Sequence, residues 1–83
     1  LIGPPTLVIE PKEDIITKDE TILIKGRTDN RIDLTINGEN VYVGSNGGFS
    51  KDVQLAAGLN VVEVKAINNF GKISKIVRQI FRE

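Results

Sequence analysis

Apolar and polar residues alternate on both sides of the dipeptide Asn37-Gly38, within the segment from Ile32 to Phe49. Alternation that is interrupted by Asn-Gly is the strongest short-range signal for a β-hairpin, because both central positions of its turn require φ > 0. A two-residue turn would pair Leu34 with Val41, whereas a four-residue loop would pair Leu34 with Val43. The two registers differ by two residues and therefore bury the same face of the hairpin. The pattern predicts the hairpin and its inward side chains and leaves the register open.

The same period of two predicts strands along most of the chain. We expect seven strands, at residues 6–10, 21–27, 31–36, 39–44, 48–55, 60–68 and 73–81. Residues 15–17 are interpreted as a short continuation of the first strand on a different partner. Short strands separated by turn signals, without helical periodicity, are typical of a small all-β sandwich. The prominence of β-branched residues also favours strands over helices.

Strand parity predicts which side chains form the core. Outside the hairpin, the expected inward residues are Leu7, Ile9, Ile22, Ile24, Phe49, Val53, Leu55, Val62, Val64 and Ala66. Lys51 shares the inward parity, so either its side chain extends to solvent at the rim or a β-bulge resets the phase there. In the last strand, Ile76 and Ile80 are expected inside, with a bulge between them. Leu59 is expected to plug one end of the core.

The chain is short and electrically balanced. Its 83 residues provide for one domain with a small core, with residues 1–5 as a stiff proline-containing linker and residues 6–83 as the domain. The 11 basic and 11 acidic residues cancel, which argues against nucleic acid as a main partner. No apolar run approaches the ~18–20 residues of a membrane span, so the domain itself is not expected to enter a membrane. The absence of cysteine excludes disulfides and thiolate metal sites.

Six short motifs occur in a consistent order and spacing. They are Pro5-Thr-Leu-Val-Ile-Glu-Pro11, Ile24-Lys-Gly-Arg-Thr28, Leu34-Thr-Ile-Asn-Gly38, Gly48-Phe49, Leu55-Ala-Ala-Gly-Leu-Asn60 and Ala66-Ile-Asn-Asn-Phe-Gly71. With these motifs the chain resembles the bacterial immunoglobulin-like domains that are grouped with the glucodextranase-type accessory domain, from Pro5 to about Phe81. It departs from that family at Asn30-Arg31, where Pro-Gly is frequent, and at Lys72, where the family has Asn.

The resemblance implies a fold and a class of function. The implied fold is an immunoglobulin-like antiparallel β-sandwich, and the implied role is that of a non-catalytic module in a secreted or membrane-anchored bacterial protein, such as the RodZ-like bitopic proteins with an extracytoplasmic tail. We therefore expect an extracytoplasmic spacer or interaction module, for example in adhesion. Its expected partners are neighbouring domains of the same chain, with another protein or a cell-envelope glycan as further candidates. The alternative is a carbohydrate-binding accessory module of a secreted glycosidase. The chain has four aromatic residues and Phe49 is expected in the core, which weakens that alternative.

No residue pattern predicts catalysis or a cofactor. The chain contains no histidine and no cysteine, which removes the commonest general base and the thiol nucleophile. Asp29, Asn30 and Asp33 lie close together in the sequence and offer the hard oxygen ligands that suit calcium. A dense acidic calcium loop is absent, so Asx side chains that cap their own turns are the favoured interpretation. We therefore expect neither a metal nor a cofactor.

Two other groups of polar residues admit a special role. An autocatalytic isopeptide bond needs a Lys, an Asn and an acid buried together, and Lys25, Lys65 and Asn60 are the candidates. The last strand carries several cations, namely Lys72, Lys75, Arg78 and Arg82. These cations would form either a basic stripe for an anionic surface or a charged guard that prevents intermolecular pairing at an edge strand. The guard interpretation is favoured.

Some apolar residues have the outward parity, namely Leu23, Tyr42, Val61 and Ile67. Scattered singly they need no explanation, whereas grouped they would mark a contact face. Leu23 and Val61 are expected on opposite sheets, so the isolated domain is expected to be monomeric. An odd number of strands would put Pro5 and Phe81 at opposite ends of a domain that is about 30–35 Å long. That separation is the geometry that a spacer requires.

Overall fold

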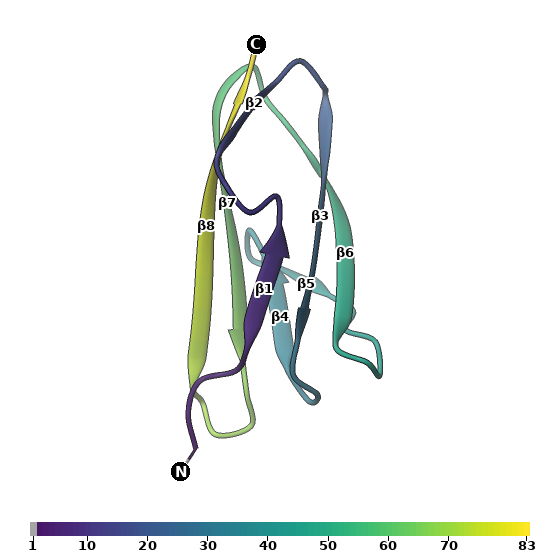
Figure 1. The fold of residues 1–83 in the computed structure, drawn as a ribbon, viewed down its shortest axis with the longest axis vertical. Coiled ribbons are helices and arrows are strands. Elements are labelled where there is room, and N and C mark those ends of the chain that lie inside the picture. Colours follow the sequence, from purple (N-terminus) through teal and green to yellow (C-terminus); the bar gives the residue numbers. More distant parts are fainter. Residues whose placement is uncertain (1) are drawn as a thin grey trace.

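The computed structural model describes residues 2–83, in which eight strands form two facing sheets and no helix occurs (Figure 1). Leu1, the first residue of the expected linker, lies outside the described residues. The strands are β1 (Leu7–Glu10), β2 (Ile15–Thr17), β3 (Thr21–Thr28), β4 (Asp33–Ile36), β5 (Glu39–Val41), β6 (Gly48–Gln54), β7 (Gly58–Ile67) and β8 (Ile73–Arg82). Within residues 2–83 there is accordingly no helix that could cross a membrane.

The two sheets have different sizes. One has three strands in the order β1-β3-β6, and the other has five in the order β2-β8-β7-β4-β5. All pairs are antiparallel except β2 with β8, which are parallel. The predicted β-sandwich is confirmed. The described residues form eight strands instead of seven, because residues 15–17 leave the sheet of β1 and form a separate strand on β8.

The central hairpin forms with the shorter of the two expected turns. Leu34 pairs with Val41, and both turn residues have positive φ, 50° at Asn37 and 81° at Gly38. The Asn37 side chain accepts a hydrogen bond from the Glu63 amide at 2.8 Å, which ties the turn to β7. β5 ends at Val41, so the second strand of the hairpin is shorter than the sequence predicted.

The core lies between the sheets and contains the residues that strand parity assigned to it. Its buried apolar members are Ile9, Ile24, Leu34, Ile36, Phe49, Leu55, Val62, Val64, Ala66 and Ile80. Gly26 is in the middle of β3 because a side chain does not fit there. A Cβ atom on Gly26 would lie 2.2 Å from the Val8 carbonyl oxygen and 2.7 Å from Cζ of Phe49. The Phe49 ring therefore packs over the glycine.

Two expectations about the core are wrong. Leu59 is 59% exposed and does not plug the core, whereas Leu55, directly after β6, is buried. The reason is that β7 begins at Gly58, which gives Leu59 the outward parity and pairs it with Phe81. The last strand has no bulge, because its register with β7 continues without interruption from Ile73 to Arg82.

Charged residues at inward positions are accommodated at the rim. Ile76 and Ile80 face inward as expected, and Arg78 lies between them with its Nε donating to the Pro11 carbonyl at 2.8 Å. The β3–β6 register also continues without a bulge, so Lys51 keeps the inward parity. Lys51 pairs with Glu39 across the open side of the sandwich at 3.2 Å. The rim position expected for Lys51 is confirmed and the bulge is excluded.

The two ends of the chain lie at opposite ends of the long axis (Figure 1). The molecule measures 44 × 20 × 19 Å, longer than the sequence suggested because β7 and β8 each contain ten residues. The Pro5 carbonyl accepts a hydrogen bond from Ser74, at the start of β8, while Phe81 is near its end. Those seven residue steps (81 − 74) correspond to about 23 Å along a strand. We call the two ends the N-terminal pole and the C-terminal pole.

Candidate functional site

The acidic residues do not form a metal site. Among the residues described, no group of three or more His, Cys, Asp or Glu side chains is arranged to hold a metal ion. One carboxylate oxygen of Asp29 accepts a hydrogen bond from the Thr6 amide at 2.9 Å, and Asp33 lies exposed at the start of β4. The sequence had suggested that Asp29 caps its own turn. Asp29 instead binds a distant segment of the backbone.

The three candidates for an isopeptide bond are not brought together. Lys25 and Lys65 lie on the outward faces of opposite sheets, and Lys25 pairs with Glu10 at 3.8 Å. Asn60 is at the C-terminal pole, where its carboxamide binds only backbone atoms. Its Oδ1 accepts from the Ala56 amide, and its Nδ2 donates to the carbonyls of Ala56, Gly58 and Ile80.

The cations of the last strand do not form one stripe. Lys75 is on the outer face, where it lies 3.9 Å from Glu63, whereas Arg78 and Arg82 have the inward parity and bind backbone carbonyls. β8 is also flanked by β2 and β7 over its last residues, so it is not an edge strand along its whole length. The basic stripe is therefore wrong. The edge-guard interpretation stays a prediction for residues 73–79, where β8 pairs only with β7 among the described residues.

The N-terminal pole holds the lead-in, residues 2–6, by side-chain hydrogen bonds to its backbone. Asn68 donates to the Gly3 carbonyl at 3.1 Å and Ser74 donates to the Pro5 carbonyl. Thr28 and Asp29 form hydrogen bonds with the backbone of Thr6. Pro5 itself is buried. The lead-in is thus attached to the β7–β8 turn and to β8.

Thr28 and Asp29 attach the lead-in to a second part of the pole. The Thr28 hydroxyl donates to the Thr6 carbonyl at 2.6 Å, and Asp29 accepts from the Thr6 amide. Among the residues described, Thr28 is the one polar residue that is buried. Because these bonds come from the end of β3 and the ones above come from the other sheet, the lead-in is fixed against both sheets.

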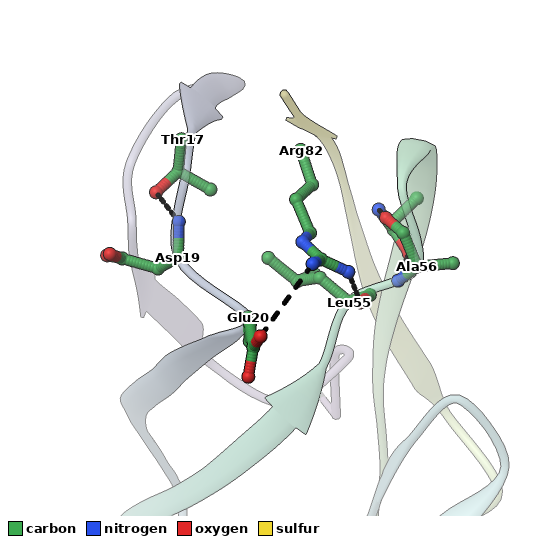
Figure 2. Close-up of polar contacts among 7 residues, drawn as sticks. Thr17, Asp19, Glu20, Leu55, Ala56 and Arg82 are labelled. Carbon is green, nitrogen blue, oxygen red and sulfur yellow. Dashed lines mark hydrogen bonds and ion pairs between the residues drawn. The ribbon is translucent and has the colours of Figure 1, made fainter.

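The C-terminal pole is closed by Arg82, which reaches from the end of β8 between two loops (Figure 2). Its NH1 donates to the Leu55 carbonyl at 3.0 Å, and NH2 lies 3.9 Å from the Glu20 carboxylate. The Leu55 amide donates in turn to the Glu20 carbonyl at 2.9 Å. The guanidinium therefore covers the end of the core and links the two sheets, but its Nε is buried without a partner among the described residues.

The side chains at both poles have structural contacts. The side chains at the N-terminal pole donate to or accept from backbone groups, and those at the C-terminal pole close loops. Parity predicted that Leu23 and Val61 lie on opposite sheets, and this is confirmed. Sequence reasoning missed the bonds that hold the lead-in, because they join residues 22 to 69 positions apart. The buried threonine that ends β3 was the available signal.

Comparison with known proteins agrees with this architecture. A fibronectin(III)-like module structure of CbhA from Clostridium thermocellum matches with a TM-score of 0.66 at 17% identity, over 100% of this chain. The chain spans 48% of that CbhA chain, or about half its length. The human titin domain ZIg10 matches with a TM-score of 0.53 at 17% identity, over 98% of this chain and 79% of the titin chain. A search of curated proteins gave no match. At these identities the structural likeness shows the fold alone.

The sequence itself assigns the family. The family described as "Glucodextranase, domain B" matches residues 4–83, which includes every strand and both poles. The resemblance that the six motifs indicated is confirmed over nearly the whole chain. The chain therefore belongs to the glucodextranase domain B family, as an immunoglobulin-like accessory domain.

Proposed function

We propose that this domain is a non-catalytic, rigid spacer that stands in series with other domains of a larger extracytoplasmic bacterial protein, secreted or anchored at the cell surface. It holds its neighbours apart and in a defined direction. The observation that carries the proposal is the combination of opposite poles with a fixed lead-in.

Opposite poles matter because a domain whose ends lie far apart adds its full length to a chain. With a long axis of 44 Å, each inserted copy would move the next domain outward by about that distance. A lid or an inserted docking domain has no need of such separation.

The fixed lead-in matters because a spacer transmits direction only when its joint is stiff. Pro4 and Pro5 restrict the backbone, and hydrogen bonds attach Gly3, Pro5 and Thr6 to both sheets. A flexible linker of the same length would allow the preceding domain to point in any direction. The structure of the N-terminal pole thus suits orientation as well as separation.

Distance measurement by double electron–electron resonance tests this proposal. The chain has no cysteine, so Gly3→Cys and Glu83→Cys introduce the only two labelling sites. A side chain at Gly3 meets no atom within 4 Å. We expect one narrow distance distribution near the 44 Å length of the molecule. Loss of two bonds in the variant Asn68→Ala, Ser74→Ala should broaden it. A broad distribution in the doubly labelled chain that keeps Asn68 and Ser74 would overturn the spacer function.

A carbohydrate-binding role is the second candidate, and one observation favours it. Tyr42 is 85% exposed and borders a shallow depression that is also lined by Asn30, Arg31 and Ser45. An exposed ring beside hydrogen-bonding side chains is a surface on which a sugar can stack. Titration calorimetry with soluble glucans and with cell-wall glycan fragments tests it. Binding that Tyr42→Ala abolishes would support a glycan site, and the absence of heat at millimolar sugar would exclude it.

A further inference from the structure

The outer face of the five-stranded sheet carries a group of exposed apolar side chains at the C-terminal pole. They are Ile16 (70% exposed), Leu59 (59%), Val61 (54%), Phe81 (45%) and Val77 (43%). We call them the C-terminal apolar patch. Of these five residues, the sequence analysis had named only Val61 as outward. The patch becomes visible only when β2, β7 and β8 are placed side by side.

The strand register brings three residues of this patch into one row. Phe81 pairs with Leu59 on one side and with Ile16 on the other, so three apolar side chains form a row across the sheet. Side chains directly opposite each other on neighbouring strands have their Cβ atoms about 5 Å apart. Val61 follows Leu59 on the same face of β7, opposite Gln79. Val77 lies beyond Gln79 on the same face of β8, opposite Glu63, so polar residues border the row toward the middle of the sheet.

The other sheet provides a contrast. Its outer face has Glu10, Lys25 and Ser50 in one cross-strand row, and Leu23 beside Asp52 in another. Apolar side chains there stand singly among polar ones, which is normal for a soluble surface. The grouping at the C-terminal pole is therefore a feature of one sheet and not of the whole surface.

The size of the patch indicates what kind of partner it fits. Five side chains that are each about half exposed offer a few hundred Å², and the largest apolar patch on a typical monomer, ~300–600 Å², is often functional. A stable complex between free proteins buries about 800 Å² on each partner, so this patch is small for one. Contacts between domains of one chain bury about 600–1,500 Å² in total, which the patch with its surroundings can supply.

The position of the patch selects a covalently attached partner. Phe81 precedes Glu83 by two residues, so a domain joined after Glu83 would begin next to the patch. A short linker gives such a neighbour an effective concentration in the millimolar range, at which a small apolar contact suffices. The N-terminal pole of this fold offers a matching surface, since Ile2 is 52% and Phe70 is 66% exposed there.

We propose that the C-terminal apolar patch is the docking surface for the N-terminal pole of an immunoglobulin-like module joined after Glu83. Apolar side chains equivalent to Ile2 and Phe70 of the following module pack on Phe81 and Leu59. The contact fixes the second joint of the spacer, as the hydrogen-bonded lead-in fixes the first. The inference rests on the proposed spacer function and adds the partner of its C-terminal end.

A tandem of two copies of this chain tests the docking surface, with Glu83 of the first copy joined directly to Leu1 of the second. Ser50→Cys in both copies supplies two spin labels on an exposed face away from the patch. We expect a narrow distribution of label distances in the tandem, because the second copy is held in one orientation. Phe81→Ser or Leu59→Ser in the first copy should broaden it at least twofold. Leu23→Ser, at a residue that is also half exposed but on the other sheet, is the matched control and should leave it unchanged.

The outcomes separate this inference from the spacer itself. A broad distribution in the unmodified tandem, or equal broadening by Leu23→Ser, would overturn the docking surface. If the single copy still gives a narrow distance between Gly3→Cys and Glu83→Cys, the spacer stands without it. Sedimentation of the single copy tests whether a free second copy of the chain occupies the patch instead. A dimer at tens of micromolar that Phe81→Ser abolishes would assign the patch to a free second copy and contradict the tethered module. Thermal melts of each variant confirm that it is folded.

Discussion

The two poles of this domain are built in different ways. At the N-terminal pole, side chains of both sheets bind the backbone of the lead-in, and the polar residue Thr28 is buried to do so. At the C-terminal pole, Arg82 and Asn60 close the loops, and the outer surface beside them is apolar and exposed. Side chains at both poles thus make polar contacts within the domain, and the C-terminal pole also presents the larger group of exposed apolar residues.

This difference indicates how each end works. Hydrogen bonds to the lead-in need nothing from outside, so the direction of the chain before the domain is set by the domain alone. An exposed apolar row stabilises nothing until another surface covers it. Under the two proposals, the N-terminal joint is stiff in isolation and the C-terminal joint becomes stiff through contact. Substitutions in the core and at each pole test this difference.

The largest effect is expected between the poles, at Val64. Its side chain is fully buried in the core that serves both ends, so Val64→Ala leaves a cavity in a small domain. We expect a loss of about 2–4 kcal/mol in the free energy of unfolding, measured by urea denaturation. A loss below about 0.5 kcal/mol would mean that β7 is not the central strand of the core.

A smaller effect is expected at the N-terminal pole from Thr28→Val. Valine keeps the shape of threonine but removes the hydroxyl that donates to the Thr6 carbonyl. We expect a loss of about 1–2 kcal/mol, since the buried position cannot supply another donor. Hydrogen exchange at Thr6 should become faster at the same time. Unchanged stability and exchange would show that the lead-in does not depend on this bond.

The smallest effect is expected at the C-terminal pole from Leu59→Ser. Leu59 is more than half exposed and packs on no covering surface in the isolated domain. The free energy of unfolding should change by less than about 0.5 kcal/mol. A calorimetric melt of the single copy provides the measurement. A loss as large as that of Thr28→Val would indicate that the apolar row stabilises the domain itself, and the comparison of the poles would not hold.

The sequence predicted what depends on local pattern and missed what depends on distant contacts. Asn37 and Gly38 specify their turn alone, because both adopt positive φ. Arg31 also has positive φ, 58°, at the position where the family frequently has glycine, and only the structure reveals this. Leu59 was misplaced because the sequence analysis began this strand at residue 60. β7 begins at Gly58, so Leu59 belongs to the strand and shares the outward parity of Val61.

The inward charge at Arg78 shows the same limit. A charged side chain at a core parity suggested a bulge, since burying it without a partner is unfavourable. The carbonyl of Pro11, 67 residues earlier, supplies the partner and removes the need for a bulge. Contacts of this kind, which also hold the lead-in, join segments far apart in sequence. The apolar patch likewise required the order of β2, β8 and β7, which periodicity does not give.

Backbone ¹⁵N relaxation of the single domain tests the central claim most directly. The claim is that the lead-in moves as one body with the sandwich, because its backbone is hydrogen-bonded to both sheets. The amides of Gly3 and Thr6 should then have order parameters of about 0.85, equal to those in the strands β7 and β8. Order parameters below about 0.6 at these two amides, with rigid strands, would contradict the account.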